Sequence, residues 1–116
     1  KLANPVVIGG DVHMHYVADL KPDFDDEKLP VVASEFCGTS ITSQGPSQKS
    51  VDALLPENPH IKLARSDHRG YVRATVGGGK FSAELIALDT VKRQDSKASV
   101  LARFVVEDGK PGPQRS

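Results

Sequence analysis

The sequence predicts a mainly β domain, with mostly antiparallel strands and one short helix. Two observations lead to this fold class. Short apolar or alternating segments recur along the chain between clusters of Gly, Pro, Ser and Asp, which is typical of strands joined by turns. Near the middle of the chain a serine precedes helix-forming residues, which is the pattern of a capped helix start. Such strands could make one layer of a sandwich, or half of one.

The first half of the chain contains two predicted strands. Residues 4–10 (NPVVIGG) are a short β-branched run without alternation, which predicts a buried strand ending in glycines. Residues 15–20 are expected to continue as an extended segment, and residues 30–38 (PVVASEFCG) are predicted as a second strand. An acidic, proline-bounded loop at 21–30 and a polar, turn-rich stretch at 39–48 complete this half.

One short helix is predicted over 51–59 (VDALLPENP). Ser47 or Ser50 could cap its start, because a serine hydroxyl accepts a hydrogen bond from a free backbone N–H of the first turn. Pro56 and Pro59 are expected to end it, since proline lacks the N–H that would continue the ladder.

The second half of the chain is predicted to be strands alone. Residues 70–76 alternate between polar and small apolar side chains, the pattern of a half-buried strand. Three glycines at 77–79 predict a hairpin turn after it, because glycine adopts the positive φ angles that tight turns require. The remaining predictions are strands, a turn and a polar tail, namely strands at 60–65, 80–88 and 99–106, a turn at 107–112, and the tail after it.

Composition limits the class of protein. A chain of 116 residues fits one domain, and its formal net charge of zero gives no electrostatic bias toward nucleic acid or acidic membranes. The apolar runs are too short to span a bilayer. The chain opens on Lys1 rather than Met and runs almost at once into a strand, so we expect it to be the tail of a longer protein.

The segment GGDVHMH, residues 9–15, carries the most informative polar side chains. On an extended segment side chains alternate in direction, so Asp11, His13 and His15 would project to one side. A carboxylate and imidazoles converging at a strand end suit Zn²⁺, Fe or Mn²⁺. The alternative is a solvent-facing loop whose histidines bind nothing.

The context of this segment resembles a known family. GGDVH is similar to the Gly-His-x-His element that closes the site of calcineurin-like metallophosphoesterases, with Asp11 in place of the first histidine. That substitution, with NPVV before it and EFCGTSITS after it, resembles the PhoD-like alkaline phosphatases. Three further blocks resemble the family in the same order, namely NPHIKLARSDHRGYVRATV (58–76), FSAELIALD (81–89) and FVVEDGKPG (104–112).

The resemblance implies that residues 1–116 are the C-terminal portion of an α/β two-sheet metallophosphoesterase domain, incomplete by itself. It implies hydrolysis of phosphate esters, monoesters or diesters, by a metal-activated hydroxide. It also implies calcium and iron as cofactors, and secretion or a periplasmic location. Asp11 matches a carboxylate ligand and His13 the histidine that closes the site. The family's other ligand motifs lie N-terminal to this region, so we expect the isolated chain to be inactive, with or without bound metal.

For other polar residues the sequence gives less support to a functional role. His15 could support a ligand or contact the substrate, or be an exposed or packed ring. The rim of the cleft could include Glu35, Thr39 and Ser40, although short polar side chains at such positions more often cap turns. Hydrogen-bonded structural roles are expected for His60 and His68. Cys37, the one cysteine, is expected to pack in the core, because free cysteine is usually buried.

Two hypotheses follow from the sequence. The first is the C-terminal part of a metal-dependent phosphatase or phosphodiesterase with Asp11 and His13 as ligands. The second is a free-standing β-module that binds a partner or one metal ion without catalysis. Under the first, strands from the missing N-terminal part would cover the strand at 4–10, so the isolated chain is expected to self-associate through 4–8 or 30–36. GGGKF is no phosphate-binding loop, because Phe81 stands where Ser or Thr must hold Mg²⁺.

Overall fold

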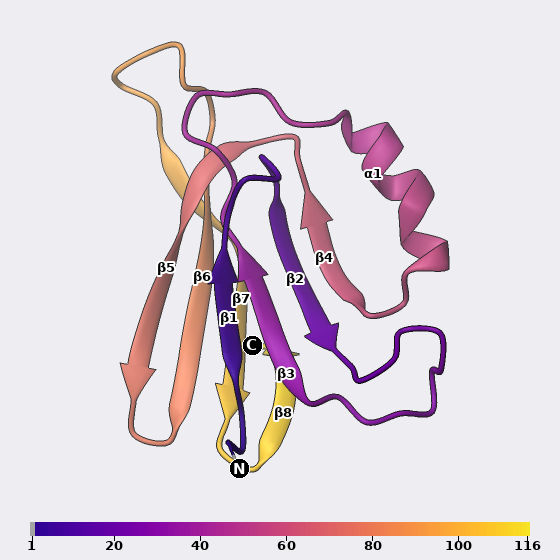
Figure 1. Ribbon diagram of the computed structural model, residues 1–116. Coiled ribbons are helices and arrows are strands. Elements are labelled where there is room, and N and C mark those ends of the chain that lie inside the picture. The colour runs from indigo at the N-terminus through magenta and orange to yellow at the C-terminus, as the bar shows by residue number, and fades with distance from the viewer. Residues whose placement is uncertain (1) are drawn as a thin grey trace.

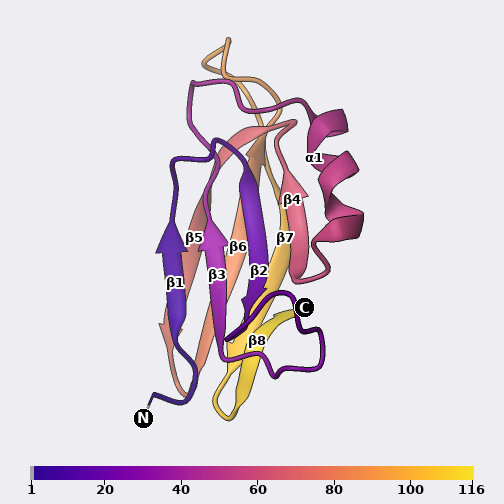
Figure 2. The same ribbon diagram turned by 45° about the vertical axis from the view of Figure 1, so that its right-hand side comes forward.

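The computed structural model describes residues 2–116 as two four-stranded sheets stacked face to face, with one short α-helix at the side (Figures 1 and 2). Lys1 lies outside the described residues. The predicted fold class, mainly β with mostly antiparallel strands, is therefore confirmed. Among residues 2–116, no helix has both the length and the apolar character needed to cross a membrane.

The first sheet has the strand order β1-β3-β2-β4. Its strands are β1 (Val6–Gly9), β3 (Ala33–Cys37), β2 (His15–Leu20) and β4 (Ile61–Arg65). β3 pairs in parallel with β1 and antiparallel with β2, and β2 pairs antiparallel with β4. β1 and β2 therefore run in opposite directions on either side of β3, and the loop between them has to cross the end of β3.

The prediction that the first strand is buried is wrong for this chain. β1 lies at the edge of its sheet, with Val7 45% and Ile8 63% exposed. Its β-branched side chains face both ways, as in a strand covered on both sides, but within residues 2–116 only β3 pairs with it. The expectation of an uncovered strand edge agrees with this arrangement.

The second sheet is an antiparallel meander in the order β5-β6-β7-β8. Its strands are β5 (Arg69–Gly77), β6 (Lys80–Leu88), β7 (Ala98–Glu107) and β8 (Lys110–Arg115). The predicted glycine hairpin joins β5 to β6, where Gly78 and Gly79 have φ angles of 56° and 78°.

The predicted polar tail is instead the edge strand β8, which corrects the sequence analysis. The turn before it is shorter than predicted and centres on Asp108 and Gly109. Two prolines in β8 hid the strand signal, but an edge strand needs backbone donors on one side only and so tolerates proline. Gly112 and Pro113 are buried, and a Cβ at Gly112 would lie 3.0 Å from the Asp19 carboxylate of β2.

The helix α1 (Gln48–Leu54) begins three residues earlier than predicted and continues into the 3-10 turn η1 (Leu55–Glu57). Ser47, one of the two predicted caps, is the capping residue: its side chain accepts a hydrogen bond from the Ser50 N–H at 3.2 Å. Pro56 lies in η1, where the regular helical ladder has ended.

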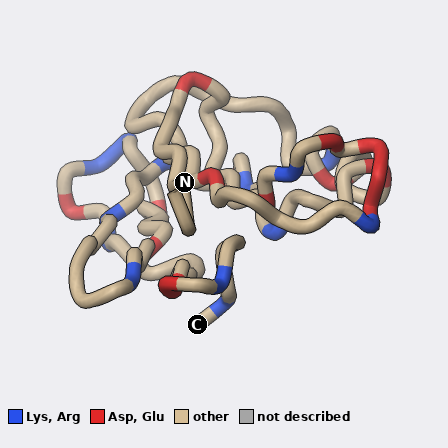
Figure 3. Tube along the Cα trace, turned by 60° about the horizontal axis from the view of Figure 1, so that its bottom comes forward, with Lys and Arg blue, Asp and Glu red and all other residues tan. Residues whose placement is uncertain are grey.

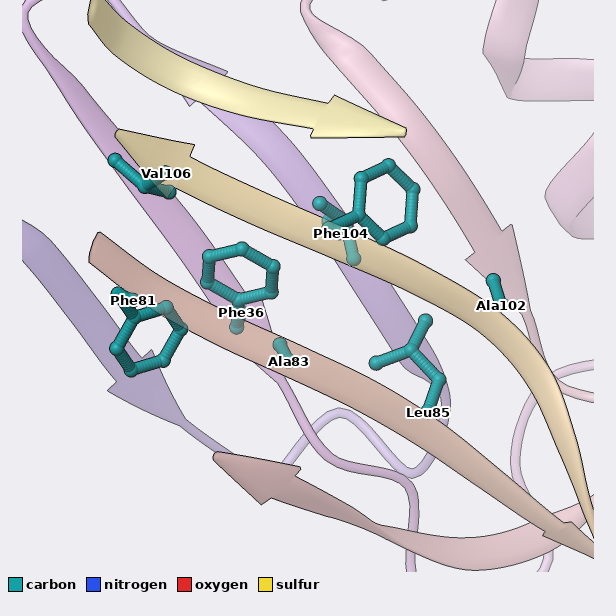
Figure 4. Packing of buried hydrophobic residues seen from close by; sticks show 8 residues of the cluster. Phe36, Phe81, Ala83, Leu85, Ala102, Phe104 and Val106 are labelled. Atoms are coloured by element: carbon teal, nitrogen blue, oxygen red, sulfur yellow. The ribbon is translucent and has the colours of Figure 1, made fainter. Parts of the chain in front are cut away.

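The hydrophobic core lies between the two sheets. Phe36 of β3 is fully buried and contacts Phe81 of β6 and Phe104 of β7, with ring centroids 5.3 Å and 6.3 Å apart (Figure 4). The cluster comprises side chains from both sheets, namely Val17, Phe36, Phe81, Ala83, Leu85, Ala102, Phe104 and Val106. This contact fixes the first sheet, and the loop between β1 and β2, on the second.

Charged residues of both signs are interspersed along the chain (Figure 3). The loop between β2 and β3 carries four exposed carboxylates within 23–27. Glu84 of β6 pairs with an arginine on each neighbouring strand, Arg73 of β5 and Arg103 of β7. The N–O distances are 2.8 Å and 3.2 Å. Because these pairs are exposed and screened by solvent, they add little to the free energy of unfolding.

Candidate metal centre

The loop between β1 and β2, residues 10–14, carries Asp11 and His13. Both residues have positive φ angles, 77° and 56°, so the segment is not extended. The prediction that Asp11, His13 and His15 alternate along one extended strand is therefore wrong. The chain has to reverse direction over the end of β3 here, and Asp and His adopt left-handed backbone conformations more readily than most residues.

His13 has a defined ring orientation. Its Nδ1 lies 3.0 Å from the Gln44 carbonyl oxygen, in the loop that follows β3. A carbonyl oxygen only accepts hydrogen bonds, so Nδ1 carries the proton and donates it. In the neutral ring Nε2 then has a free lone pair, which is the form of histidine that binds a metal ion. Asp11 is exposed at the same loop, two residues away.

Arg69, at the start of β5, is a residue of this region that the sequence analysis missed. Only 7% of it is exposed, and it donates hydrogen bonds to the His13 carbonyl at 3.2 Å and to the Ser66 carbonyl at 2.6 Å. In the sequence Arg69 stands in a polar run, SDHRG, which is indistinguishable from a solvated turn. The glycine that follows, Gly70, is a weak sequence signal that this segment packs closely on another one. In the structure a Cβ at Gly70 would lie 1.8 Å from the Ile86 carbonyl oxygen.

His15, the first residue of β2, lies in the packed interior rather than on a rim. It is fully buried, and its Nε2–H donates to the Ile86 carbonyl of β6 at 3.0 Å. Burial lowers the pKa of His15, with the nearby Arg69 cation acting in the same direction and the Ile86 hydrogen bond against it. His15 is thus a neutral ring that joins the two sheets beneath the loop of His13.

The three predicted rim residues lie on β3 and just beyond it. Glu35 is half-buried and accepts a weak hydrogen bond from the Cys37 thiol at 3.8 Å. Thr39 is buried and donates to the His68 carbonyl at 3.2 Å, and Ser40 donates to the Ser43 carbonyl. The Ser40 hydroxyl therefore fixes a local turn, whereas the Thr39 hydroxyl joins the segment after β3 to the segment before β5.

Cys37 is buried at the end of β3, as expected for a core cysteine. Burial and the neighbouring Glu35 carboxylate raise the pKa of its thiol. Because the thiolate is the reactive form, this environment disfavours nucleophilic reactivity.

Of the other two histidines, His60 lies apart from the loop of His13, whereas His68 lies next to Arg69 and lines the same pocket as Gln44. The ring of His60 packs against Phe24 with centroids 4.6 Å apart, near the opposite end of β2. Nδ1 of His68 lies 3.2 Å from the Asp67 carboxylate. Hydrogen bonds from Arg65 are the main reason that the pKa of Asp67 falls to about 2.

The side chains of this chain fit a partial set of metal ligands. Asp11 offers carboxylate oxygens and His13 offers Nε2, donors that suit hard and borderline cations respectively. Within residues 2–116, no three His, Cys, Asp or Glu side chains come together as a metal-binding group. Since catalytic sites usually provide about three protein ligands per ion, these two residues fit a share of a metal centre and do not complete one.

Comparison with known proteins agrees with the resemblance seen in the sequence. The family described as PhoD-like phosphatase matches residues 1–85. Alkaline phosphatase D of Bacillus subtilis (strain 168) is 37% identical over 114 residues, which are 96% of this chain and 19% of that protein. A solved structure of PhoD superposes with a TM-score of 0.83 at 34% identity, covering 95% of this chain and 22% of the other. The chain therefore spans about a fifth of the length of these relatives.

Proposed function

The chain belongs to the PhoD-like phosphatase family, and on that premise we propose that it forms the C-terminal part of a metal-dependent phosphate ester hydrolase. The parent enzyme would act as an alkaline phosphatase or phosphodiesterase outside the cytoplasm. The observation that carries the proposal is the loop between β1 and β2, which presents a carboxylate and, two residues further on, an imidazole whose Nδ1 is bound to a backbone carbonyl.

In this proposal Asp11 and His13 supply two ligands to the metal centre. Calcium and iron, the ions we propose, would provide Lewis-acid stabilisation of the phosphoryl oxygens when bound. The hydrogen bond from His13 Nδ1 to the Gln44 carbonyl selects, for the neutral ring, the tautomer in which the Nε2 lone pair is free to bind a metal ion. The Asp11 carboxylate contributes negative charge that lowers the net charge of a centre of two cations.

The remaining ligands would come from the part of the parent protein that precedes this chain. The open edge of β1 favours such an arrangement, because an exposed apolar strand edge invites another strand to pair with it. Beside β1 lies a groove of about 550 Å³, and the apolar side chains that line it are Val6, Ile8, Val76, Phe81 and Val106. We propose that the N-terminal part of the parent covers this edge and groove.

The ligand roles are tested in the full-length parent protein. Asp11→Ala and His13→Ala should each lower the hydrolysis of p-nitrophenyl phosphate by orders of magnitude and reduce the bound metal. His60→Ala is the matched control, because His60 packs on Phe24 near the other end of β2. Metal content is measured per folded protein by elemental analysis, together with turnover.

His15→Ala should reduce activity much less than either ligand variant when folded fractions are compared. If His15→Ala or His60→Ala were the most damaging change, the assignment of Asp11 and His13 would be wrong.

A further inference from the structure

We propose that Arg69 is a positioning residue that holds the loop of His13 in its metal-binding conformation. The inference rests on the proposed role of His13 as a ligand. It concerns a residue on the second sheet that would not itself touch metal or substrate.

Arg69 joins three separate segments by hydrogen bonds from one buried guanidinium. The two N–H groups of Nη1 are shared among three acceptors, namely the carbonyls of His13 and Ser43, at 3.2 Å and 2.5 Å, and the Ser40 hydroxyl. Nη2 donates to the Ser66 carbonyl at 2.6 Å. These acceptors come from the loop between β1 and β2, the loop after β3, and the turn that precedes β5.

The acceptors are all uncharged. In the described part of the chain the hydrogen-bonding partners of Arg69 are three carbonyls and one hydroxyl, and none of them is a carboxylate. Burying a cation without a compensating anion is costly, so general stability does not favour this arrangement. The planar guanidinium offers several donors in a fixed geometry, which lysine or glutamine cannot reproduce, and so it specifies the relative positions of the loops.

The loop after β3 holds His13 from a second side. A Cβ at Gly45 would lie 2.2 Å from the His13 carbonyl oxygen, so backbone packs directly on backbone there. The neighbouring Gln44 carbonyl accepts the hydrogen bond from His13 Nδ1, and Ser43 is bonded to Arg69. Arg69 therefore fixes both the His13 backbone, held at a φ of 56°, and the segment that orients the His13 ring.

Loss of Arg69 should release both restraints together. The His13 carbonyl would lose its charged donor, and residues 43–45 would no longer be held against the loop. Nε2 of His13 would then sample orientations that do not face the metal, and metal affinity would fall although both proposed ligands remain. Groups that orient metal ligands typically change metal affinity by about 10–100-fold.

The test is a double-mutant cycle in the full-length protein, read out as Mn²⁺ affinity by competition with a chelator. Arg69→Gln should weaken Mn²⁺ binding by about 10–100-fold. Because Arg69 acts through His13, the double variant R69Q/H13A should bind Mn²⁺ no more weakly than H13A alone. Arg73→Gln is the matched control, since Arg73 lies on the same strand but pairs with Glu84 on an exposed face, and it should leave the affinity unchanged.

Two milder variants test the same contacts if Arg69→Gln does not fold. Ser40→Ala removes one acceptor of Arg69, and Gly45→Ala displaces the His13 backbone while Arg69 stays intact. Both variants should weaken Mn²⁺ binding, and Gly45→Ala should weaken it more than Ser40→Ala. The thermal unfolding temperature of each variant is measured in parallel.

The outcomes separate this inference from the proposed function. Unchanged Mn²⁺ affinity in Arg69→Gln, or in both milder variants, overturns the role of Arg69, as does an additive effect in the double variant. If His13→Ala itself leaves Mn²⁺ affinity unchanged, the proposed function fails and the inference fails with it. A loss in His13→Ala without any loss in Arg69→Gln removes the inference alone.

Discussion

Replacing Phe36 by Ala should strongly destabilise the chain, because this ring is the main aromatic contact between the two sheets. Phe36 is fully buried, and its ring lies against Phe81 and Phe104 of the second sheet. Truncation would remove both aromatic contacts and leave a cavity between closely packed layers. Phe→Ala changes in cores cost about 3–5 kcal/mol. At about 4 °C per kcal/mol for a chain of this size, the unfolding temperature should fall by roughly 12–20 °C.

Phe24 provides the matched control for this measurement. It is the same residue type, 49% exposed, and packs on His60 at the surface. Phe24→Ala should therefore cost about 1 kcal/mol or less. Urea unfolding followed by circular dichroism gives the free energy of unfolding of each variant. Equal effects of the two substitutions would refute the account of the core, because the loss would then not depend on burial between the sheets.

Three further predictions concern charge, association and activity. Asp67, whose pKa is lowered to about 2 chiefly by hydrogen bonds from Arg65, should contribute stability that is complete above the unfolded pKa near 4 and is lost as the pH falls toward 2. After allowance for solvent screening, the free energy of unfolding should be about 1 kcal/mol higher at pH 5 than at pH 2.5 on account of Asp67, as measured by urea unfolding. This contribution should be absent in Asp67→Asn and kept in the exposed control Asp25→Asn. The isolated chain should sediment as a dimer or larger species at micromolar concentration. Ile8→Lys should shift it toward monomer, and Leu54→Lys on the helix should have no effect. A clean monomer of the unchanged chain would contradict this prediction. The isolated chain should not turn over p-nitrophenyl phosphate, so chelator-sensitive turnover by the purified 116 residues would show that its metal site is complete.

The strands and hairpins could be predicted from the sequence because their signals are local. Alternation at 70–76 and the three glycines after it led to β5, its turn and β6. Ser47 likewise marked the start of the helix. The edge strand β8 was missed because Pro111 and Pro113 weaken the local signal, although pairing with β7 compensates for it.

The candidate site was only partly predictable because its geometry depends on contacts between distant segments. Asp11 and His13 were identifiable from residue type and spacing, but the direction of their side chains depends on the crossing of the loop over β3. Whether His15 would be a surface or a packed ring depended on its contact with Ile86, which lies 71 residues away. Arg69 was missed for the same reason, because charged residues in short polar runs are normally exposed and only the fold buries this one.

The central claim is that Asp11 and His13 bind a metal ion together, and anomalous diffraction from Mn²⁺-loaded crystals of the full-length parent tests it most directly. The account predicts an anomalous peak about 2.0–2.2 Å from His13 Nε2 and from an Asp11 carboxylate oxygen, the usual range of metal–ligand bonds. It also predicts that His13 Nδ1 still donates to the Gln44 carbonyl beside that peak. A metal peak bonded to neither residue, or bonded to Nδ1 of His13, would contradict it.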